Sequence, residues 1–245
     1  TLYVKTVGDN TVMTAAQMKS VADAVLALAA PATVDFSEVV YESTTFPNSF
    51  KSNANLAGIV FPQNVTATAS AAFQKTGMTS VTVLKDISYG SNAFDSCASL
   101  VSVTVEEGVT EIGNYMFQNT KLTDVTLPNS VTKIGASAFN GCSLTTINFG
   151  QGVKTIENSA FQNCGELTEI ILPDATETLG QNAFGDCPKL AKISLGKNMK
   201  TLEAYCFVGY SKGCPLLGDI ICRATTPPTL KDDYGTGPFG GSWYD

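Results

Sequence analysis

Apolar residues recur along this chain in a fixed pattern with a period of about 22 residues. The clearest position is a phenylalanine that follows a small or apolar residue, as in "ASAFNGC" and "NSAFQNC". A leucine or methionine comes next, and then two apolar residues separated by a single residue. The phenylalanine stands at Phe50, Phe73, Phe94, Phe117, Phe139, Phe161, Phe184 and Phe207. Eight copies of one pattern predict a solenoid, in which each repeat stacks on its neighbours.

Each repeat also carries a short strand signal between two turn signals. The apolar pair, such as Val103 and Val105, alternates with period two, which is typical of a β-strand. Turn-forming residues such as Asn, Gly, Asp and Pro flank it on both sides. Strands separated by a full repeat must pair in parallel, about 4.8 Å apart. The fold class that follows is an α/β leucine-rich repeat solenoid, with one parallel β-strand per rung of 22–23 residues and a phenylalanine ladder inside.

The two ends differ from the repeats, and the end rungs of a solenoid need covering. Residues 1–7 alternate like a short strand, and a helix is expected to begin at Thr14, which forms a capping box with Gln17. Pro31 is expected to end the helix. We interpret this strand and helix as a cap over the first rung, rather than as an element that binds a partner. The helix is expected to bury Ala15, Met18, Val21, Ala22, Val25, Leu26 and Ala29.

At the C-terminal end the pattern becomes irregular. An insertion precedes Cys214, two prolines at 227 and 228 interrupt the strand pattern, and Phe239 is a candidate for a last anchor. The predicted organisation is therefore an N-terminal cap over 1–33, a solenoid over 34–224 and a C-terminal cap or degenerate rung over 225–245.

Composition narrows the classes of function. Charged residues make up 15% of the 245 residues and the net charge is −7, which argues against nucleic acid and anionic membrane as partners. The longest apolar run is too short to cross a bilayer, so we expect no membrane insertion of this segment. The sequence begins at Thr1 without a methionine. We therefore expect any signal peptide or lipid anchor to lie outside this sequence.

The chain offers little catalytic chemistry. It contains no histidine, which removes Ser-His-Asp triads, Cys-His pairs and imidazole metal sites. Carboxylate pairs can hydrolyse glycosides without histidine, but the acids here fall at turn and strand-surface positions. We expect no enzyme, no catalytic residue, no metal and no cofactor. A polysaccharide-active enzyme is kept as a distant alternative.

Seven cysteines are present, and four of them share one repeat position, three residues after the phenylalanine. Other rungs carry asparagine or threonine there, so we expect these cysteines to be small, buried and reduced. A metal site of stacked thiolates lacks any CxxC pair to support it. A disulfide between Cys206 and Cys214 stays open at this point. The four cysteines in the shared position are Cys97, Cys142, Cys164 and Cys187.

The candidate binding surface is the outward face of the predicted strands. Its side chains are mostly short and polar, with scattered charges, and none is aromatic. A plain solvated face of good β-formers is the competing interpretation. The candidate residues are Ser102, Thr104, Asp124, Thr126, Thr146, Asn148, Glu169, Ile171, Lys192 and Ser194.

The repeat resembles a known family. The segment "LTDVTLPNSVTKIGASAFNGC" at 122–142 is similar, almost letter for letter, to the BspA-type leucine-rich repeat of bacterial surface and secreted proteins, and "RATTPPTL" is also typical of them. The resemblance covers roughly 46–230. It implies a curved, non-catalytic solenoid, often exported, that in some members is an adhesin.

Two functions follow from these observations as expectations. The first is an extracellular or bacterial cell-surface module that binds a protein or glycan ligand in an adhesin-like way. The second is a structural spacer that displays another domain.

Overall fold

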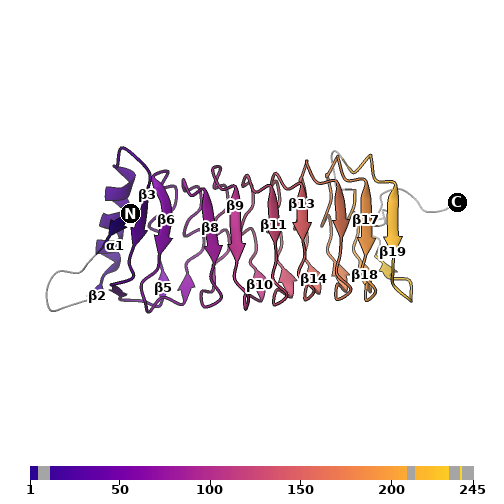
Figure 1. Ribbon diagram of the computed structural model, residues 1–245, viewed down its shortest axis with the longest axis horizontal. Coiled ribbons are helices and arrows are strands. Elements are labelled where there is room, and N and C mark those ends of the chain that lie inside the picture. Colours follow the sequence, from indigo (N-terminus) through magenta and orange to yellow (C-terminus); the bar gives the residue numbers. More distant parts are fainter. Residues whose placement is uncertain (5–11, 209–212, 232–237, 239–245) are drawn as a thin grey trace.

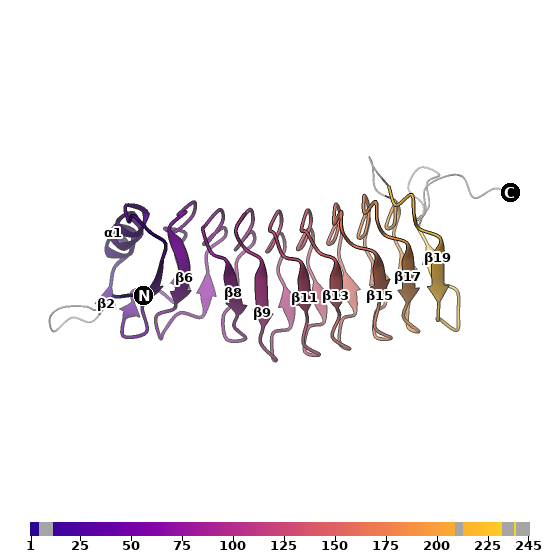
Figure 2. The same cartoon turned by 45° about the horizontal axis from the view of Figure 1, so that its top comes forward.

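The computed structural model describes residues 1–4, 12–208, 213–231 and 238 of the 245-residue chain. They form a solenoid of stacked rungs with a single helix at the N-terminal end (Figure 1). The rod runs nearly straight in two views related by a 45° turn, rather than along the curve that the family resemblance implies (Figure 2).

The first ladder of strands contains the predicted apolar pairs. We call its outward side the strand face. All its pairings are parallel, and the strands fall into four sheets ordered β1-β3-β6, β8-β9, β11-β13 and β15-β17-β19. These strands are β1 (Leu2–Tyr3), β3 (Ala32–Asp35), β6 (Leu56–Val60), β8 (Ser80–Val83), β9 (Ser102–Val105), β11 (Asp124–Thr126), β13 (Thr146–Asn148), β15 (Glu169–Ile171), β17 (Lys192–Leu195) and β19 (Asp219–Cys222).

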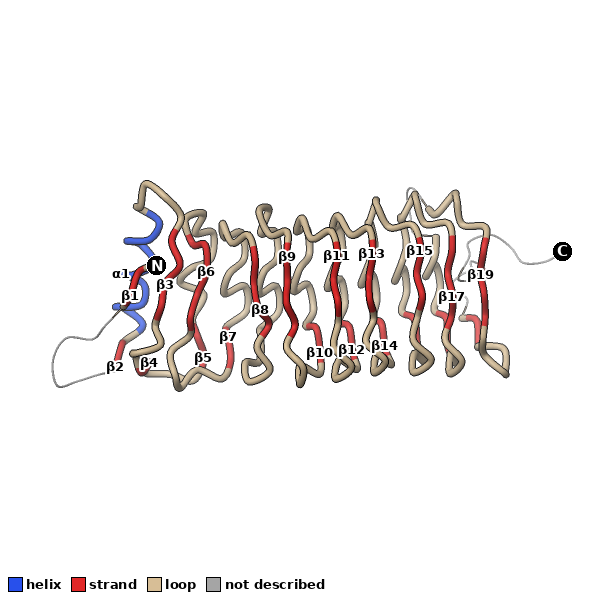
Figure 3. The backbone as a smooth tube through the Cα atoms, in the orientation of Figure 1, coloured by secondary structure: helices blue, strands red, loops and turns tan. Residues whose placement is uncertain are grey.

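A second ladder of two-residue strands runs along another side of the rod (Figure 3). The repeat pattern predicts one strand per rung, so this second ladder is a difference from the prediction. Its longest sheet has six strands, from β10 to β20. Its strands are β2 (Val12–Met13), β4 (Val40–Tyr41), β5 (Thr45–Phe46), β7 (Ala67–Thr68), β10 (Glu111–Ile112), β12 (Lys133–Ile134), β14 (Thr155–Ile156), β16 (Thr178–Leu179), β18 (Thr201–Leu202) and β20 (Thr229–Leu230).

The interior of the rod is a continuous stack of phenylalanine rings. All eight predicted anchors are buried. From Phe73 to Phe184 the centroids of successive rings lie 5.2–5.6 Å apart, and from Phe184 to Phe207 they lie 6.4 Å apart. Phe46 stacks on Phe50 and is tilted against Phe73, so it joins the first anchor to the second. The register read from the sequence is confirmed by this stack.

The turn around each anchor takes a repeated backbone form. The residues two positions before and two positions after the anchor have positive φ. Around Phe161 these are Ser159, with φ 58°, and Asn163, with φ 60°. Few of these residues are glycine, although positive φ costs other residues free energy. Hydrogen bonds between successive turns hold the conformation: Phe139 N–H donates to Ala160 O at 2.8 Å, and Phe161 N–H donates to Ala183 O at 2.8 Å.

The helix α1 (Ala15–Leu26) lies at the N-terminal end of the rod. Thr14 is its N-cap, and the predicted capping box with Gln17 is present. The helix ends at Leu26, before Pro31, so the predicted stop was too late. The apolar stripe is also narrower than predicted. Of its seven residues, Met18, Ala22 and Val25 are buried, Val21 is half-buried, and Ala15, Leu26 and Ala29 are exposed.

Two asparagines join the helix to the solenoid. Asn53 Nδ2 donates to Ala22 O at 2.8 Å, and Asn55 Nδ2 donates to Leu26 O at 2.9 Å. At the other end, the second-ladder strand β20 directly follows the two prolines. Phe239, the proposed last anchor, lies outside the described residues. The domain boundaries after residues 33 and 224 stay predictions.

Candidate functional site

The ten predicted binding residues form two columns on the strand face. Eight of them are exposed, and Lys192 and Ser194 are half-buried. Parallel pairing places Asp124 beside Thr146 and Glu169 beside Lys192 in one column. The pairs Thr126–Asn148 and Ile171–Ser194 belong to the other column. Because parallel strands repeat about every 4.8 Å, both columns present a side chain at that interval.

Charged side chains on this face are paired with one another between rungs. Lys192 Nζ lies 2.7 Å from Glu169 Oε1, and this hydrogen bond raises the pKa of the lysine. Among the described residues, no ion pair involves the Asp124 carboxylate, which accepts a hydrogen bond from the Thr123 hydroxyl at 3.2 Å. The Asp124 carboxylate is thus not ion-paired within the described residues, whereas Glu169 and Lys192 on the same face form a neutral pair.

Three interruptions divide the strand face. Strand β6 does not pair with β8, β9 does not pair with β11, and β13 does not pair with β15. Each interruption falls where the segment from anchor to strand changes length by one residue: Phe139–Ile147, for example, is one residue shorter than Phe161–Ile170. A length change at a surface turn leaves the phenylalanine stack intact and accompanies each of these three losses of pairing, although β8 and β9 stay paired across a change of the same size.

Two of these interruptions open into hollows. The hollow between β6 and β8 has a volume of about 340 Å³. Gly58, which has no side chain, lies in it together with Ser80, Thr82, Ser102 and Thr104. The hollow between β13 and β15 has a volume of about 380 Å³ and is lined in part by Asn148, Ile171 and Arg223. Four candidate binding residues therefore line the two hollows: Ser102, Thr104, Asn148 and Ile171.

Arg223 is a feature of this face that the sequence analysis missed. It is the only arginine in the chain. Its guanidinium donates to Leu195 O at 3.1 Å and to Leu172 O at 2.9 Å, and it lies 3.3 Å from Asp174 Oδ1. The side chain thus reaches across several rungs to the edge of the second hollow. A single arginine in the sequence could have drawn attention to this position. Because Arg223 lies beyond the last regular repeat, however, its contacts with Leu172 and Leu195 could not be predicted from the repeat pattern.

The cysteine column is structural. All seven cysteines are free in the structure, so Cys206 and Cys214 are not bridged. Cys142 Sγ donates to Phe117 O at 3.1 Å, and Cys164 Sγ donates to Phe139 O at 3.3 Å. Thr120 fills the same repeat position and donates to Phe117 O at 2.9 Å. The position therefore needs a small donor that bonds a buried carbonyl, which explains why threonine and cysteine alternate there.

Burial makes these thiols unreactive. Desolvation raises the pKa of Cys142 to about 11, although its hydrogen bonds with Thr120 act in the opposite direction. Burial also raises the pKa of Cys164 and of Cys206 well above the ordinary value for a thiol. The described residues include no group of three or more Cys, Asp or Glu side chains arranged to hold a metal ion. Within the same residues, no helix has the length and apolar character needed to cross a membrane.

Comparisons with known proteins agree with this architecture. A family model described as the BspA-type leucine-rich repeat region matches residues 32–89 and 87–213, with six copies. A leucine-rich cell surface protein from Faecalibacterium prausnitzii A2-165 is similar in structure, with 23% identity and a TM-score of 0.54. That match covers 79% of this chain and 60% of the other, so the present chain spans less than two thirds of that protein.

A leucine-rich repeat protein from Eubacterium ventriosum ATCC 27560 is also similar, with 21% identity and a TM-score of 0.51. The match covers 84% of this chain and 69% of the other. At these identities the two likenesses show the fold alone. No curated protein matches the chain.

Proposed function

The chain belongs to the BspA-type leucine-rich repeat family, and we propose that it is a non-catalytic module whose strand face binds an extended protein or glycan ligand. We place this binding outside the cell, on a bacterial surface or in a secreted protein. Two observations support the location. The repeats match the BspA type, which resembles that of bacterial surface and secreted proteins, and a similar structure is that of a cell surface protein.

The observation that carries the proposal is the pair of hollows on the strand face. They lie four strand intervals apart, which is about 20 Å at about 4.8 Å per strand. Six residues of an extended chain cover the same distance at about 3.3 Å per residue. Binding energy concentrates in a few side chains that fill pockets. A partner segment with two anchor side chains about six residues apart therefore matches this face.

The two columns between the hollows suit an extended ligand. Thr104, Thr126 and Asn148 present donors and acceptors at regular intervals. A ligand chain that runs across the strands therefore meets a similar polar side chain on each strand. Such a surface contributes contacts along its length, whereas a compact metabolite would use only one part of it.

A screen with matched variants tests this function. The purified chain is applied to an array of extracellular-matrix proteins and glycans, together with a variant that carries Thr104→Lys, Thr126→Lys and Asn148→Lys. The control variant carries Ser99→Lys, Thr132→Lys and Asn198→Lys, which adds the same charge at exposed positions outside the two columns. Loss of the captured partner by the first variant alone supports the proposal.

Three other outcomes count against it. Equal binding by both variants removes the site from the strand face. No binding to any array component favours a spacer that displays another domain. Steady hydrolysis of a polysaccharide, abolished by one carboxylate substitution, favours an enzyme.

A further inference from the structure

The second ladder contains a defect that the proposed function does not use. Between β7 and β10, the repeat that contains Tyr89 makes only an isolated bridge, Ala67 to Ser88, and its next neighbour, β10, starts a new sheet. The sequence gives the reason. The segment from Val83 to Phe94 is one residue shorter than the corresponding segment from Val105 to Phe117. The shorter segment cannot follow the path of the longer one, so the two separate.

The separation leaves backbone groups without their ladder partners. At the next boundary, Thr132 N–H donates to Thr110 O at 2.9 Å and Gly135 N–H donates to Ile112 O at 2.8 Å. Across the defect, the corresponding donors are the N–H groups of Thr110 and Gly113, and neither donates to an acceptor among the described residues. Ladder donors left without a protein partner need water or a ligand.

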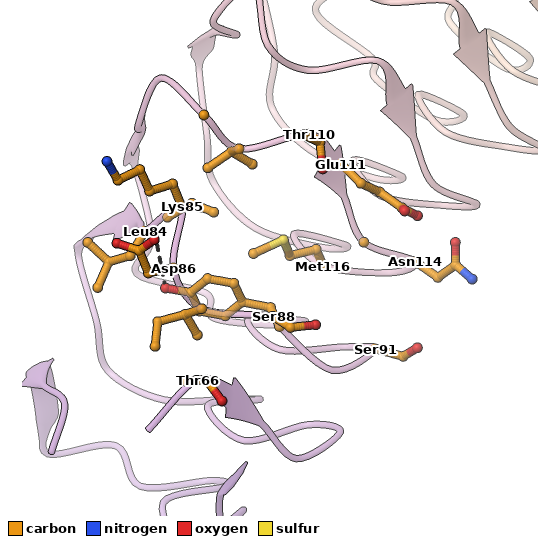
Figure 4. Close-up of a pocket in the computed structure, with 16 residues that line it drawn as sticks. Thr66, Leu84, Lys85, Asp86, Ser88, Ser91, Thr110, Glu111, Asn114 and Met116 are labelled. Carbon is orange, nitrogen blue, oxygen red and sulfur yellow. Dashed lines mark hydrogen bonds between the residues drawn. The ribbon is translucent and has the colours of Figure 1, made fainter. Parts of the chain in front are cut away.

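The defect opens into a cavity of about 500 Å³, the largest of the hollows described above and within the range of about 300–1,000 Å³ that small ligands use. Figure 4 shows Thr66 and Ser88 on one side of it and Thr110 and Glu111 on the other. The side chain of Met116 lies between them. The cavity thus has hydroxyl and carboxylate groups at its walls, with the buried Met116 behind them.

Tyr89 closes the inner side of this defect. It stands where the following repeats carry isoleucine or leucine, and its larger ring contacts Phe61 and Phe94, with centroids 6.5 and 5.6 Å away. Its hydroxyl accepts a hydrogen bond from Leu84 N–H at 3.3 Å. Burial raises the pKa of this phenol to about 12. The ring therefore fills the core where the shorter segment left room, while the cavity outside it stays open.

Charge at the cavity is mixed. Lys85 contributes a positive charge and Asp86 and Glu111 contribute negative charges. Glu111 is itself paired with Lys133, with Nζ 3.1 Å from Oε1. Neither sign dominates, so a neutral ligand with many hydroxyl groups is favoured over an anion or a cation. Hydroxyl groups also match a wall that offers both donors and acceptors.

We propose that this cavity binds a neutral monosaccharide unit, held by the free N–H groups of Thr110 and Gly113 and by the polar side chains around them. The site goes beyond the proposed binding on the strand face and does not depend on it. The site lies where the Val83–Phe94 segment is one residue shorter than the corresponding segment of the next repeat.

Titration of the isotope-labelled chain followed by amide NMR tests the proposal. The probes are glucose, galactose and N-acetylglucosamine, with glucuronate and inorganic phosphate as anionic comparators. We expect at least one neutral sugar to shift the amide signals of Thr110 and Gly113 in a saturable way. Thr110→Trp should fill the cavity and weaken this binding about tenfold or more, while Thr132→Trp, at the same position one repeat later, should leave it unchanged.

The result that overturns the proposal is the absence of saturable shifts with every neutral sugar, or equal binding by the two tryptophan variants. Saturation by phosphate or glucuronate alone also overturns it, because it assigns the cavity to an anion. If Thr110→Trp fails to fold, Glu111→Gln and Ser88→Ala measure the two opposite walls, with an expected loss of several-fold each. The triple-lysine variant of the strand face should bind the sugar normally, so failure here is distinct from failure of the proposed function.

Discussion

The rings of Phe139 and Phe161 stack at a centroid distance of 5.2 Å with an interplanar angle of 4°. Both side chains are fully buried, and each belongs to a different rung. This contact joins consecutive repeats through the core, and the same contact recurs along most of the rod. Stability therefore depends on a chain of nearest-neighbour contacts, as expected of a solenoid.

Phe161→Ala should lower the free energy of unfolding by about 3–5 kcal/mol, the usual cost of truncating a core aromatic residue that its neighbours cannot replace. Ile171→Ala is the control, because Ile171 lies in the same turn of the solenoid but is 59% exposed, and it should change stability by less than about 0.5 kcal/mol. Denaturant unfolding measures both. A loss below about 1 kcal/mol for Phe161→Ala would contradict the buried stack.

The native protein should expose few thiols. Cys222 is exposed and Cys214 is half-buried, whereas the other five cysteines are buried. We expect rapid reaction with a thiol reagent at Cys222, slow reaction at Cys214 and none at the buried five. All seven should react after denaturation without reductant. Failure to release the four thiols at 97, 142, 164 and 187 would show that they are bridged or bound.

Stability should fall as the pH rises from about 9 to about 11. Burial raises the pKa of Cys142 and of Cys214 from 9.0 to about 11, so over this range the unfolded chain loses thiol protons that the folded chain keeps. The unfolded state then binds fewer protons, and the free energy of unfolding decreases with pH. The stabilisation is fully present below pH 9 and is lost as pH passes the folded pKa.

A variant with Cys142→Thr, Cys164→Thr and Cys187→Thr isolates the thiol contribution to this decrease. Threonine already fills this position at Thr76 and Thr120, where it donates to the anchor carbonyl of its own rung rather than of the preceding one, and it does not titrate. Denaturant unfolding at several pH values should show a shallower decrease for the variant. An identical decrease in both proteins would assign the pH dependence to other groups, among them the buried thiols of Cys97 and Cys206 and the half-buried thiol of Cys214.

Charge on the strand face should act on the rate of association. Asp124→Lys together with Glu169→Lys should change the association rate of a captured partner more than its dissociation rate, because charges at the rim of an interface steer the encounter. Rates measured at two salt concentrations check this, and higher salt should reduce the difference.

The repeat pattern predicted the core better than the surface. Apolar positions with a fixed period must face a common interior, so Phe139, Phe161 and the rest of the stack could be placed from the sequence. The capping box at Thr14 was also readable, because it depends on residues three positions apart. The end of α1 was placed too late, because Pro31 shows only where a helix cannot continue.

The surface features depend on small differences between repeats. The cavity beside Tyr89 results from one missing residue, and its consequence for pairing emerges only when two unequal segments lie side by side. The reach of Arg223 to Leu172 likewise depends on stacking that brings distant residues together. A sequence pattern averages over such differences, whereas both proposed binding sites lie where the repeats depart from it.

One measurement tests the central claim, that the strand face holds the partner. A photoreactive amino acid is placed at Thr126 on the strand face in one variant and at Thr132 on the second ladder in another; both threonines are exposed and lie in the same rung. Each variant is irradiated with the partner captured on the array. If the strand face binds the partner, we expect cross-linking from position 126 and none from position 132. Cross-linking from position 132 alone would contradict binding on the strand face.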